Sequence, residues 1–294
     1  MDLQGYLADR CRIVDAALDE YLPPEDHCPS AICRAMRYSV MQGGKRIRPI
    51  LTLAGCEAVG GDQKSALPTA CAIEFIHTFS LIHDDLPALD NDDFRRGQPT
   101  SHRVFGEAMA ILAGDALLTL AFETIAGHTT DVPAETVLRV VNRVATATGT
   151  EGMVIGEAAD IESEGKQVDL DTLRSIHSRK TGALIEAAVV CGGMLSGASE
   201  AQLNALSAYG RGIGLAFQIT DDILDVVGDS AKLGKTVGSD VRKKKATYPA
   251  IMGLEKSEEL AKTALDEALD ALSGFDERAD ALRAIARFVV ERES

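Results

Sequence analysis

Five aspartates crowd into one stretch of the sequence, HDDLPALDNDDFRRG (83–97), and two arginines follow them. Like charges at such spacing repel one another and raise the free energy of the folded chain. A hard divalent cation offsets this repulsion, because such ions prefer several carboxylate oxygens. Arg95 and Arg96 favour a phosphate group beside the cation, since guanidinium binds phosphate as a fork. The alternative for this stretch by itself is a solvated acidic loop.

A second group of carboxylates lies in LAFQITDDILDVV (215–227). Gly214, Gln218, Asp221 and Asp225 recur at i, i+4, i+7 and i+11, so they share one face of a helix. The flanking residues are strongly apolar, and we therefore expect this helix to be buried on most sides. Carboxylates on such a helix indicate a ligand more than a solvated patch.

Basic residues accompany both acidic groups. KRIRP (45–49) follows two glycines and precedes a helix start, which is typical of a phosphate cradle. KLGKTVGSDVRKKKATYP (232–249) follows the second acidic group and could close over a phosphate, or be an ordinary surface loop. His77 lies seven residues before Asp84 on the same helix face, where a lone histidine is more often a core residue than a ligand.

The composition predicts a helical protein. Hydrophobic residues make up 46% of the 294 residues and aromatic residues only 4%, with no Trp, whereas strands favour aromatic side chains. A net charge of −15 argues against a nucleic-acid partner. Six scattered cysteines without CxxC spacing indicate a reducing compartment. Because no signal segment and no apolar run of ~18 residues is evident, we expect a cytoplasmic protein without stable membrane insertion.

The sequence shows no strand-type alternation, no internal repeat and no interdomain linker, so residues 1–294 are predicted to form a single all-α domain. Pro87 disfavours helical geometry at Leu86, so the chain can bend after Asp85 and bring Asp90 back beside Asp84. Apolar periodicity, caps and breakers predict helices over 1–22, 29–42, 49–59, 68–85, 108–126, 131–148, 169–192 and 199–227, with two more in 249–294.

Taken together, these motifs resemble the trans-isoprenyl diphosphate synthase family. DDLPALDNDDFRRG (84–97) and DDILD (221–225) look like its two aspartate-rich motifs. GGKRIRP (43–49), the pairs Lys180-Thr181 and Phe217-Gln218, and the GK…KATYP segment match as well, in the right order. The DDxxxxD spacing of the first motif is similar to that of bacterial farnesyl diphosphate synthases and plant-type geranylgeranyl enzymes.

The resemblance implies an isoprenoid synthase fold, with antiparallel helices around a central active-site cavity, and usually a homodimer. It implies a Mg²⁺-dependent prenyltransferase, with three ions and Mn²⁺ as a possible substitute, that joins isopentenyl diphosphate to allylic diphosphates. Allylic diphosphate ionises, the isopentenyl double bond attacks, and the departing diphosphate takes the proton. The residues implied as metal ligands are Asp84, Asp90, Asp221 and Asp225.

The resemblance also assigns the remaining site residues. Those implied for the allylic diphosphate are Arg95, Lys180, Lys235 and Lys245. Those implied for isopentenyl diphosphate are Lys45, Arg48, His77 and Arg96, which moves His77 from core residue to ligand. Thr181 and Gln218 would line the path of the allylic cation, and with Lys180 they form the implied catalytic set. Glu157 departs from the family, which more often has Gln at this position.

Product length is expected to depend on bulk at the fourth and fifth positions before Asp84, which are Ser80 and Phe79. An aromatic at the fifth position is usual in bacterial-type farnesyl synthases, so Phe79 predicts a fifteen-carbon product and a (2E,6E)-farnesyl diphosphate synthase, or geranyltranstransferase. The alternatives are a geranylgeranyl diphosphate synthase, a terpene cyclase of similar fold, or a non-catalytic partner subunit.

Overall fold

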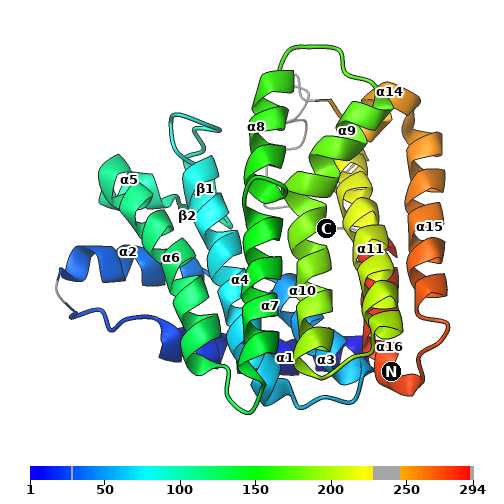
Figure 1. Cartoon of the computed structure of the whole chain (residues 1–294). Coiled ribbons are helices and arrows are strands. Elements are labelled where there is room, and N and C mark those ends of the chain that lie inside the picture. Colours follow the sequence, from blue (N-terminus) through cyan, green and yellow to red (C-terminus); the bar gives the residue numbers. More distant parts are fainter. Residues whose placement is uncertain (28, 228–245, 292–294) are drawn as a thin grey trace.

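The computed structural model describes residues 1–27, 29–227 and 246–291. Helix accounts for 77% of the chain and strand for 1%, which confirms the predicted all-α class. Long helices run side by side along one direction of the molecule, and shorter elements close the ends (Figure 1). In the first half the elements are α1 (Leu3–Tyr21), α2 (Ser30–Met41), α3 (Ile47–Ala58), α4 (Gln63–Asp84), β1 (Phe94–Arg95), β2 (Gln98–Pro99), α5 (Ser101–Phe105), α6 (Glu107–His128) and α7 (Ala134–Thr148).

The second half contains one irregular helical run and the longest described helix. A π-helical turn, η1, links α9 to α10 without a break in helical backbone. The elements of the second half are α8 (Met153–Ser163), α9 (Leu170–His177), η1 (Ser178–Gly182), α10 (Ala183–Leu195), α11 (Glu200–Val227), α14 (Tyr248–Met252), α15 (Leu254–Ala271), a 3₁₀ turn (Glu277–Ala279) and α16 (Asp280–Glu291).

Local signals explain most helix boundaries. The side chain of Asp169 caps α9 by accepting from Thr172 N at 2.8 Å, and Ser199 and Gln202 form the expected capping box before α11. The predicted start of α4 at Pro68 is wrong. Asp62 caps that helix through Lys64 N, so Pro68 lies inside its second turn.

Three other sequence predictions need correction. The helix predicted from Asp131 starts at Ala134, because the left-handed backbone of Asp131 lies outside it. The run predicted to stop at Gly192 continues to Leu195. The segment around 94–99 was expected to lack strands, yet it forms a two-residue antiparallel hairpin. Such short strands carry no side-chain alternation that a sequence could reveal.

Two helices are longer and more apolar than the apolar runs expected from the sequence. By length and composition alone, α4 and α6 could each cross a bilayer. The apolar window of α4 is 72% buried, as befits the core helix of the bundle, but that of α6 is only 39% buried. α6 therefore presents a large apolar surface outward, including Ile111 and Leu112.

Glycines permit close approach between the helices that frame the centre of the bundle. A Cβ on Gly55 of α3 would collide with the backbone of Val189 in α10, and one on Gly192 would collide with that of Thr52. These contacts bring the α3 and α10 backbones together. The C-terminal ends of α4 and α11 both lie at the end of the bundle that carries the hairpin, α9 and α14 (Figure 1).

Candidate active site

The first acidic motif bends back on itself at the end of α4. Asp84 is the last helical residue, and its carbonyl oxygen accepts from Asp90 N at 2.8 Å. This hydrogen bond places the two aspartates side by side, as expected from the bend that Pro87 favours after Asp85. Burial, and then repulsion by Glu157 and Asp90, raise the pKa of Asp84 to about 7, although Lys180 and Arg95 lower it. Burial thus makes the charged form of this carboxylate costly, and a nearby cation would favour it.

Asp85 has a different environment from Asp84. It is buried, and Arg95 Nε donates to both its carboxylate oxygens at 2.9 Å while Nη2 donates to Oδ1 at 2.6 Å. Burial raises the pKa of Asp85 despite the opposing Arg95 charge. This fork fixes Arg95 against the end of α4. No signal in the sequence predicts this pairing, since either aspartate of the DD pair could bind Arg95.

The second acidic motif also separates into different environments. Asp221 and Asp225 are half-buried on α11. Asp222 is buried and accepts from Tyr248 N at 2.9 Å, so it anchors the start of α14. Burial lowers the pKa of Arg48 on α3, and attraction by Glu74 and Asp221 opposes that shift. Asp221 therefore lies within electrostatic reach of the basic segment on the opposite side of the bundle.

Lys180 lies on the π-helical turn and faces two carboxylates of α8. Its Nζ is 2.6 Å from Glu157 Oε2 and 2.7 Å from Asp160 Oδ2. Burial would lower the pKa of Lys180, but the two acids outweigh burial and raise it. Asp160 is not among the site residues predicted from the sequence, although its spacing of three from Glu157 predicts a shared helix face.

Small residues hold this turn in place. A Cβ on Gly156 of α8 would strike the backbone of Lys180, and one on Gly214 of α11 would lie 2.9 Å from Gly182 Cα. The turn is thus packed between α8 and α11. Thr181 lies on it beside Lys180, and Gln218 lies one helical turn beyond Gly214, so the predicted catalytic residues occupy two adjoining elements. π-helical turns are frequent at functional sites.

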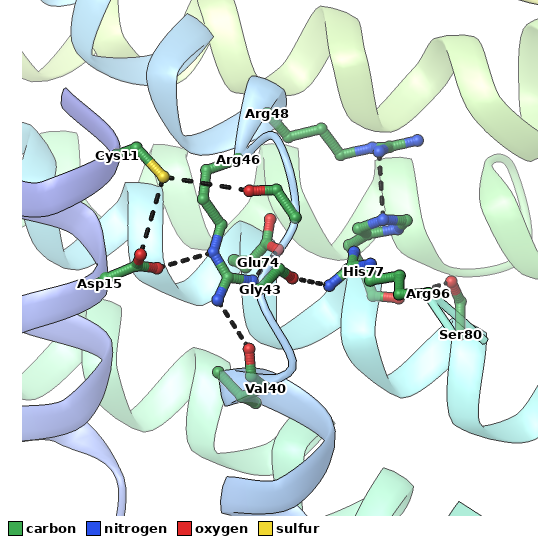
Figure 2. A network of polar contacts seen from close by, with 11 residues as sticks. Cys11, Asp15, Val40, Gly43, Arg46, Arg48, Glu74, His77, Ser80 and Arg96 are labelled. Carbon is green, nitrogen blue, oxygen red and sulfur yellow. Dashed lines mark hydrogen bonds and ion pairs between the residues drawn. The ribbon is translucent and has the colours of Figure 1, made fainter. Parts of the chain in front are cut away.

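The predicted isopentenyl diphosphate ligands gather around the segment that precedes α3. Arg48 Nη1 lies 3.3 Å from His77 Nε2, and Arg96 Nη1 donates to the Gly43 carbonyl (Figure 2). Burial, and then the positive charges of Arg48 and Arg96, lower the pKa of His77 well below its ordinary value. A neutral imidazole can accept a hydrogen bond from Arg48 through Nε2. Lys45 is exposed on the same segment.

The remaining predicted residues fall into two groups. Phe79 is 9% exposed and packs edge-on against His83, with ring centroids 4.8 Å apart. Ser80 is half-buried and donates to the His77 carbonyl at 2.9 Å. Lys235 and Lys245, predicted in the GK…KATYP segment, lie outside the described residues.

The donor set fits a hard divalent cation. Within residues 1–27, 29–227 and 246–291, no three metal-binding side chains are already gathered into one cluster. However, Asp84 and Asp90 lie side by side and repel each other, and Asp221 and Asp225 form a second half-buried pair. Carboxylates at the end of α4 and on α11 suit ions that arrive together with an anionic substrate, because phosphate oxygens supply the remaining ligands of Mg²⁺.

Comparison with known proteins gives consistent matches. The polyprenyl synthetase family profile matches residues 29–287. A geranylgeranyl diphosphate synthase of Cyanophora paradoxa is 50% identical over all of this chain and 97% of its own length. A dimethylallyltranstransferase of Fischerella ambigua is 51% identical over 99% of this chain and 84% of its own. A solved geranylgeranyl pyrophosphate synthetase of Pyrococcus horikoshii superposes with a TM-score of 0.91, 35% identity and full coverage of both chains.

These relatives correct the fifteen-carbon prediction. Full-length relatives at about 50% identity include geranylgeranyl diphosphate synthases, so the prediction of a farnesyl diphosphate synthase is wrong. The physical reason lies in the placement of Phe79. Its ring leans on His83, which in turn packs against Gly114 of α6. An aromatic residue at this position therefore does not by itself set the limit at fifteen carbons.

Proposed function

The chain belongs to the polyprenyl synthetase family, and we propose that this prenyltransferase condenses isopentenyl diphosphate with allylic diphosphates to form geranylgeranyl diphosphate. The observation that carries the proposal is the pairing of two half-buried carboxylate groups, on α4 and α11, with separate sets of basic side chains. The full-length resemblance to geranylgeranyl diphosphate synthases supports the twenty-carbon product.

Asp84, Asp90, Asp221 and Asp225 would hold Mg²⁺, which supplies Lewis acidity that offsets negative charge as the allylic C–O bond breaks. Arg95, fixed by Asp85, would bind the allylic diphosphate together with Lys180. The fixed guanidinium requires no reordering when the substrate arrives, which favours binding. Lys45, Arg48, His77 and Arg96 would bind the diphosphate of the second substrate.

Thr181 and Gln218 would face the allylic cation. A hydroxyl and an amide oxygen can orient partial negative charge toward a carbocation without forming a bond to it. The isopentenyl double bond then attacks, and the proton lost from the new chain passes to the departing diphosphate. The apolar helices on the far side of the two acidic groups would hold the hydrocarbon chain.

We also propose that the chain works as a homodimer. The apolar window of α6 is only 39% buried, and Ile111 and Leu112 on this helix are 43% and 51% exposed. Exposed apolar side chains on one helix favour association with a partner, and a second copy presents the same surface to it. Sedimentation equilibrium of the wild type against Leu112→Glu tests this proposal. A monomeric wild type would refute it.

The test of function is product chromatography. Purified protein receives Mg²⁺, excess isopentenyl diphosphate and, in separate reactions, dimethylallyl, geranyl or farnesyl diphosphate. The expected result is geranylgeranyl diphosphate from each starter. A product no longer than fifteen carbons would overturn the twenty-carbon proposal, and cyclic products or no diphosphate release would overturn the synthase itself.

A further inference from the structure

Arg46 differs from its two basic neighbours in the segment Gly43–Arg48. Its side chain is 1% exposed, whereas Lys45 is exposed and Arg48 extends to His77. Figure 2 shows the Arg46 guanidinium between Asp15 and Glu74, whereas Arg48 is directed toward His77. Since Arg46 is buried behind the segment, it is not placed to touch a substrate there.

The guanidinium of Arg46 joins three helices. Its Nε donates to Asp15 Oδ1 of α1 at 2.8 Å, and its Nη1 donates to Glu74 Oε1 of α4 at 2.6 Å. Its Nη2 donates to the Val40 carbonyl near the end of α2 at 2.7 Å. All three nitrogens are therefore used, and each contacts a different element. Lysine cannot replace this fork, because its three N–H donors share one nitrogen, which cannot lie within hydrogen-bond distance of all three acceptors.

The backbone at Arg46 also needs external support. Its φ of 47° is left-handed, and Gly43 and Gly44 before it have φ values of 82° and 133°. A left-handed conformation is unfavourable for a residue with a Cβ, so it persists only where the surroundings hold it. Here the Arg46 carbonyl accepts from Ile50 N at 3.0 Å and begins α3. The three side-chain contacts thus hold the conformation from which α3 starts.

The contact with Glu74 and the Arg48–His77 contact lie on the same side of α4. Glu74 and His77 are three residues apart, which places them on one helix face. Arg46 and Arg48 reach these two residues from the segment opposite. Arg96 also contacts this segment, because it donates to the Gly43 carbonyl and its Cζ lies 2.8 Å from the position that a Gly44 Cβ would take. Any shift of Arg46 from Glu74 would therefore change the distance between Arg48 and His77.

We propose that Arg46 is a positioning residue for isopentenyl diphosphate: it holds Lys45, Arg48, His77 and Arg96 at the spacing that the diphosphate requires. This inference rests on the proposed function, since it needs isopentenyl diphosphate as a substrate. It assigns the role to the network of Arg46 with Asp15 and Glu74, not to the charge of Arg46 alone.

The experiment is a calorimetric titration of isopentenyl diphosphate into the wild type and Arg46→Lys, without allylic substrate so that no reaction occurs. Lysine keeps the charge but loses the three-way fork. The dissociation constant should rise about tenfold, the factor that corresponds to 1.4 kcal/mol. In steady-state kinetics the KM for the allylic diphosphate should change by less than about twofold. Asp15→Asn, at a half-exposed position, should weaken isopentenyl diphosphate binding in the same direction and by less.

Arg10→Lys is the matched control. Arg10 also joins α1 to α3, with its Nε 2.9 Å from Glu57 Oε1, but it meets α3 at the end remote from Arg48. The Arg10→Lys variant should have a lower melting temperature but the same dissociation constant for isopentenyl diphosphate as the wild type. The inference is overturned if Arg46→Lys binds like the wild type, or if Arg10→Lys weakens binding equally. A wild type that neither binds isopentenyl diphosphate nor forms product would instead overturn the proposed function.

Discussion

The Nζ of Lys180 lies 2.6 Å from Glu157 Oε2, and the same carboxylate raises the pKa of Asp84 on the facing helix. Glu157 therefore acts on a predicted diphosphate ligand and on a predicted metal ligand at once. Glu157→Gln should weaken Mg²⁺ binding several-fold, because one negative charge is removed beside Asp84. The measurement is the Mg²⁺ concentration for half-maximal activity, together with calorimetric Mg²⁺ binding in the presence of diphosphate.

Asp160→Asn is the control for that experiment. Asp160 is 2.7 Å from Lys180, whereas Glu157 is the charge that contributes most to raising the pKa of Asp84. It should alter the KM for the allylic diphosphate with little effect on the Mg²⁺ requirement. Equal Mg²⁺ effects in both variants would show that Lys180 alone transmits them.

Neighbouring aspartates of the second motif should respond differently to mutation. Asp221→Ala, like Asp84→Ala, should reduce turnover by orders of magnitude at saturating Mg²⁺ while the melting temperature is retained. Asp222→Ala should instead lower the free energy of unfolding by about 1–3 kcal/mol, because the buried Tyr248 N loses its acceptor. Urea unfolding and initial rates separate the two effects. Near-normal rates for Asp84→Ala and Asp221→Ala would refute the metal assignment.

The two basic sets should affect different Michaelis constants. Lys45→Ala or Arg48→Ala should chiefly raise the apparent KM for isopentenyl diphosphate, since each removes a charge-assisted contact of roughly 1.5–3 kcal/mol. Arg95→Lys should raise the KM for the allylic substrate, because lysine cannot reproduce the fork on Asp85. A rise of only the allylic KM in the first two variants would mean that the two subsites are exchanged.

His77 should make the protein less stable in mild acid. Its pKa in the folded state is depressed, whereas in the unfolded chain it is about 6.5. The unfolded chain therefore binds the proton first as the pH falls, so the free energy of unfolding decreases below about pH 6.5, by up to ~1.4 kcal/mol per pH unit. His77→Gln should flatten this dependence in urea unfolding between pH 7 and pH 5. His27→Gln, at an exposed position, should leave it unchanged; identical slopes in all three proteins would contradict the prediction.

Phe79→Ala should lengthen the product and lower the stability together. Removing a ring that is 9% exposed opens space on α4 and costs about 3–5 kcal/mol of unfolding free energy. The product should then exceed the length made by the wild type, measured by chromatography with farnesyl diphosphate as starter. Phe105→Ala, which loses a similar edge-on contact with Tyr38, should lower stability without a change in product. An unchanged product in Phe79→Ala would assign the ring to packing alone.

Helix positions were largely predictable from the sequence because apolar periodicity and caps are local. The start of α4 was not, because Pro68 can occupy either the first turn of a helix or a position shortly after it, and the cap at Asp62 decides. The family motifs identified the predicted site residues, but not the contacts behind them. Arg95 with Asp85, Arg46 with Glu74, and Lys180 with Asp160 depend on how separate helices approach each other. Product length also depends on how deep the space for the growing prenyl chain is, and the residue type at one position does not determine that depth.

The π-helical turn places a phase shift inside one continuous helical rod from Leu170 to Leu195. A π turn contains one residue more than the α-helix would need, so removing one residue would restore regular winding. That deletion would rotate one end of the rod relative to the other by about 100°. Either Lys180 would leave Glu157, or the apolar side of α10 would turn away from α3. The π turn lets Lys180 contact the acids of α8 while the apolar side of α10 packs against α3. A single-residue deletion in this turn should therefore destabilise the protein far more than a deletion in a loop.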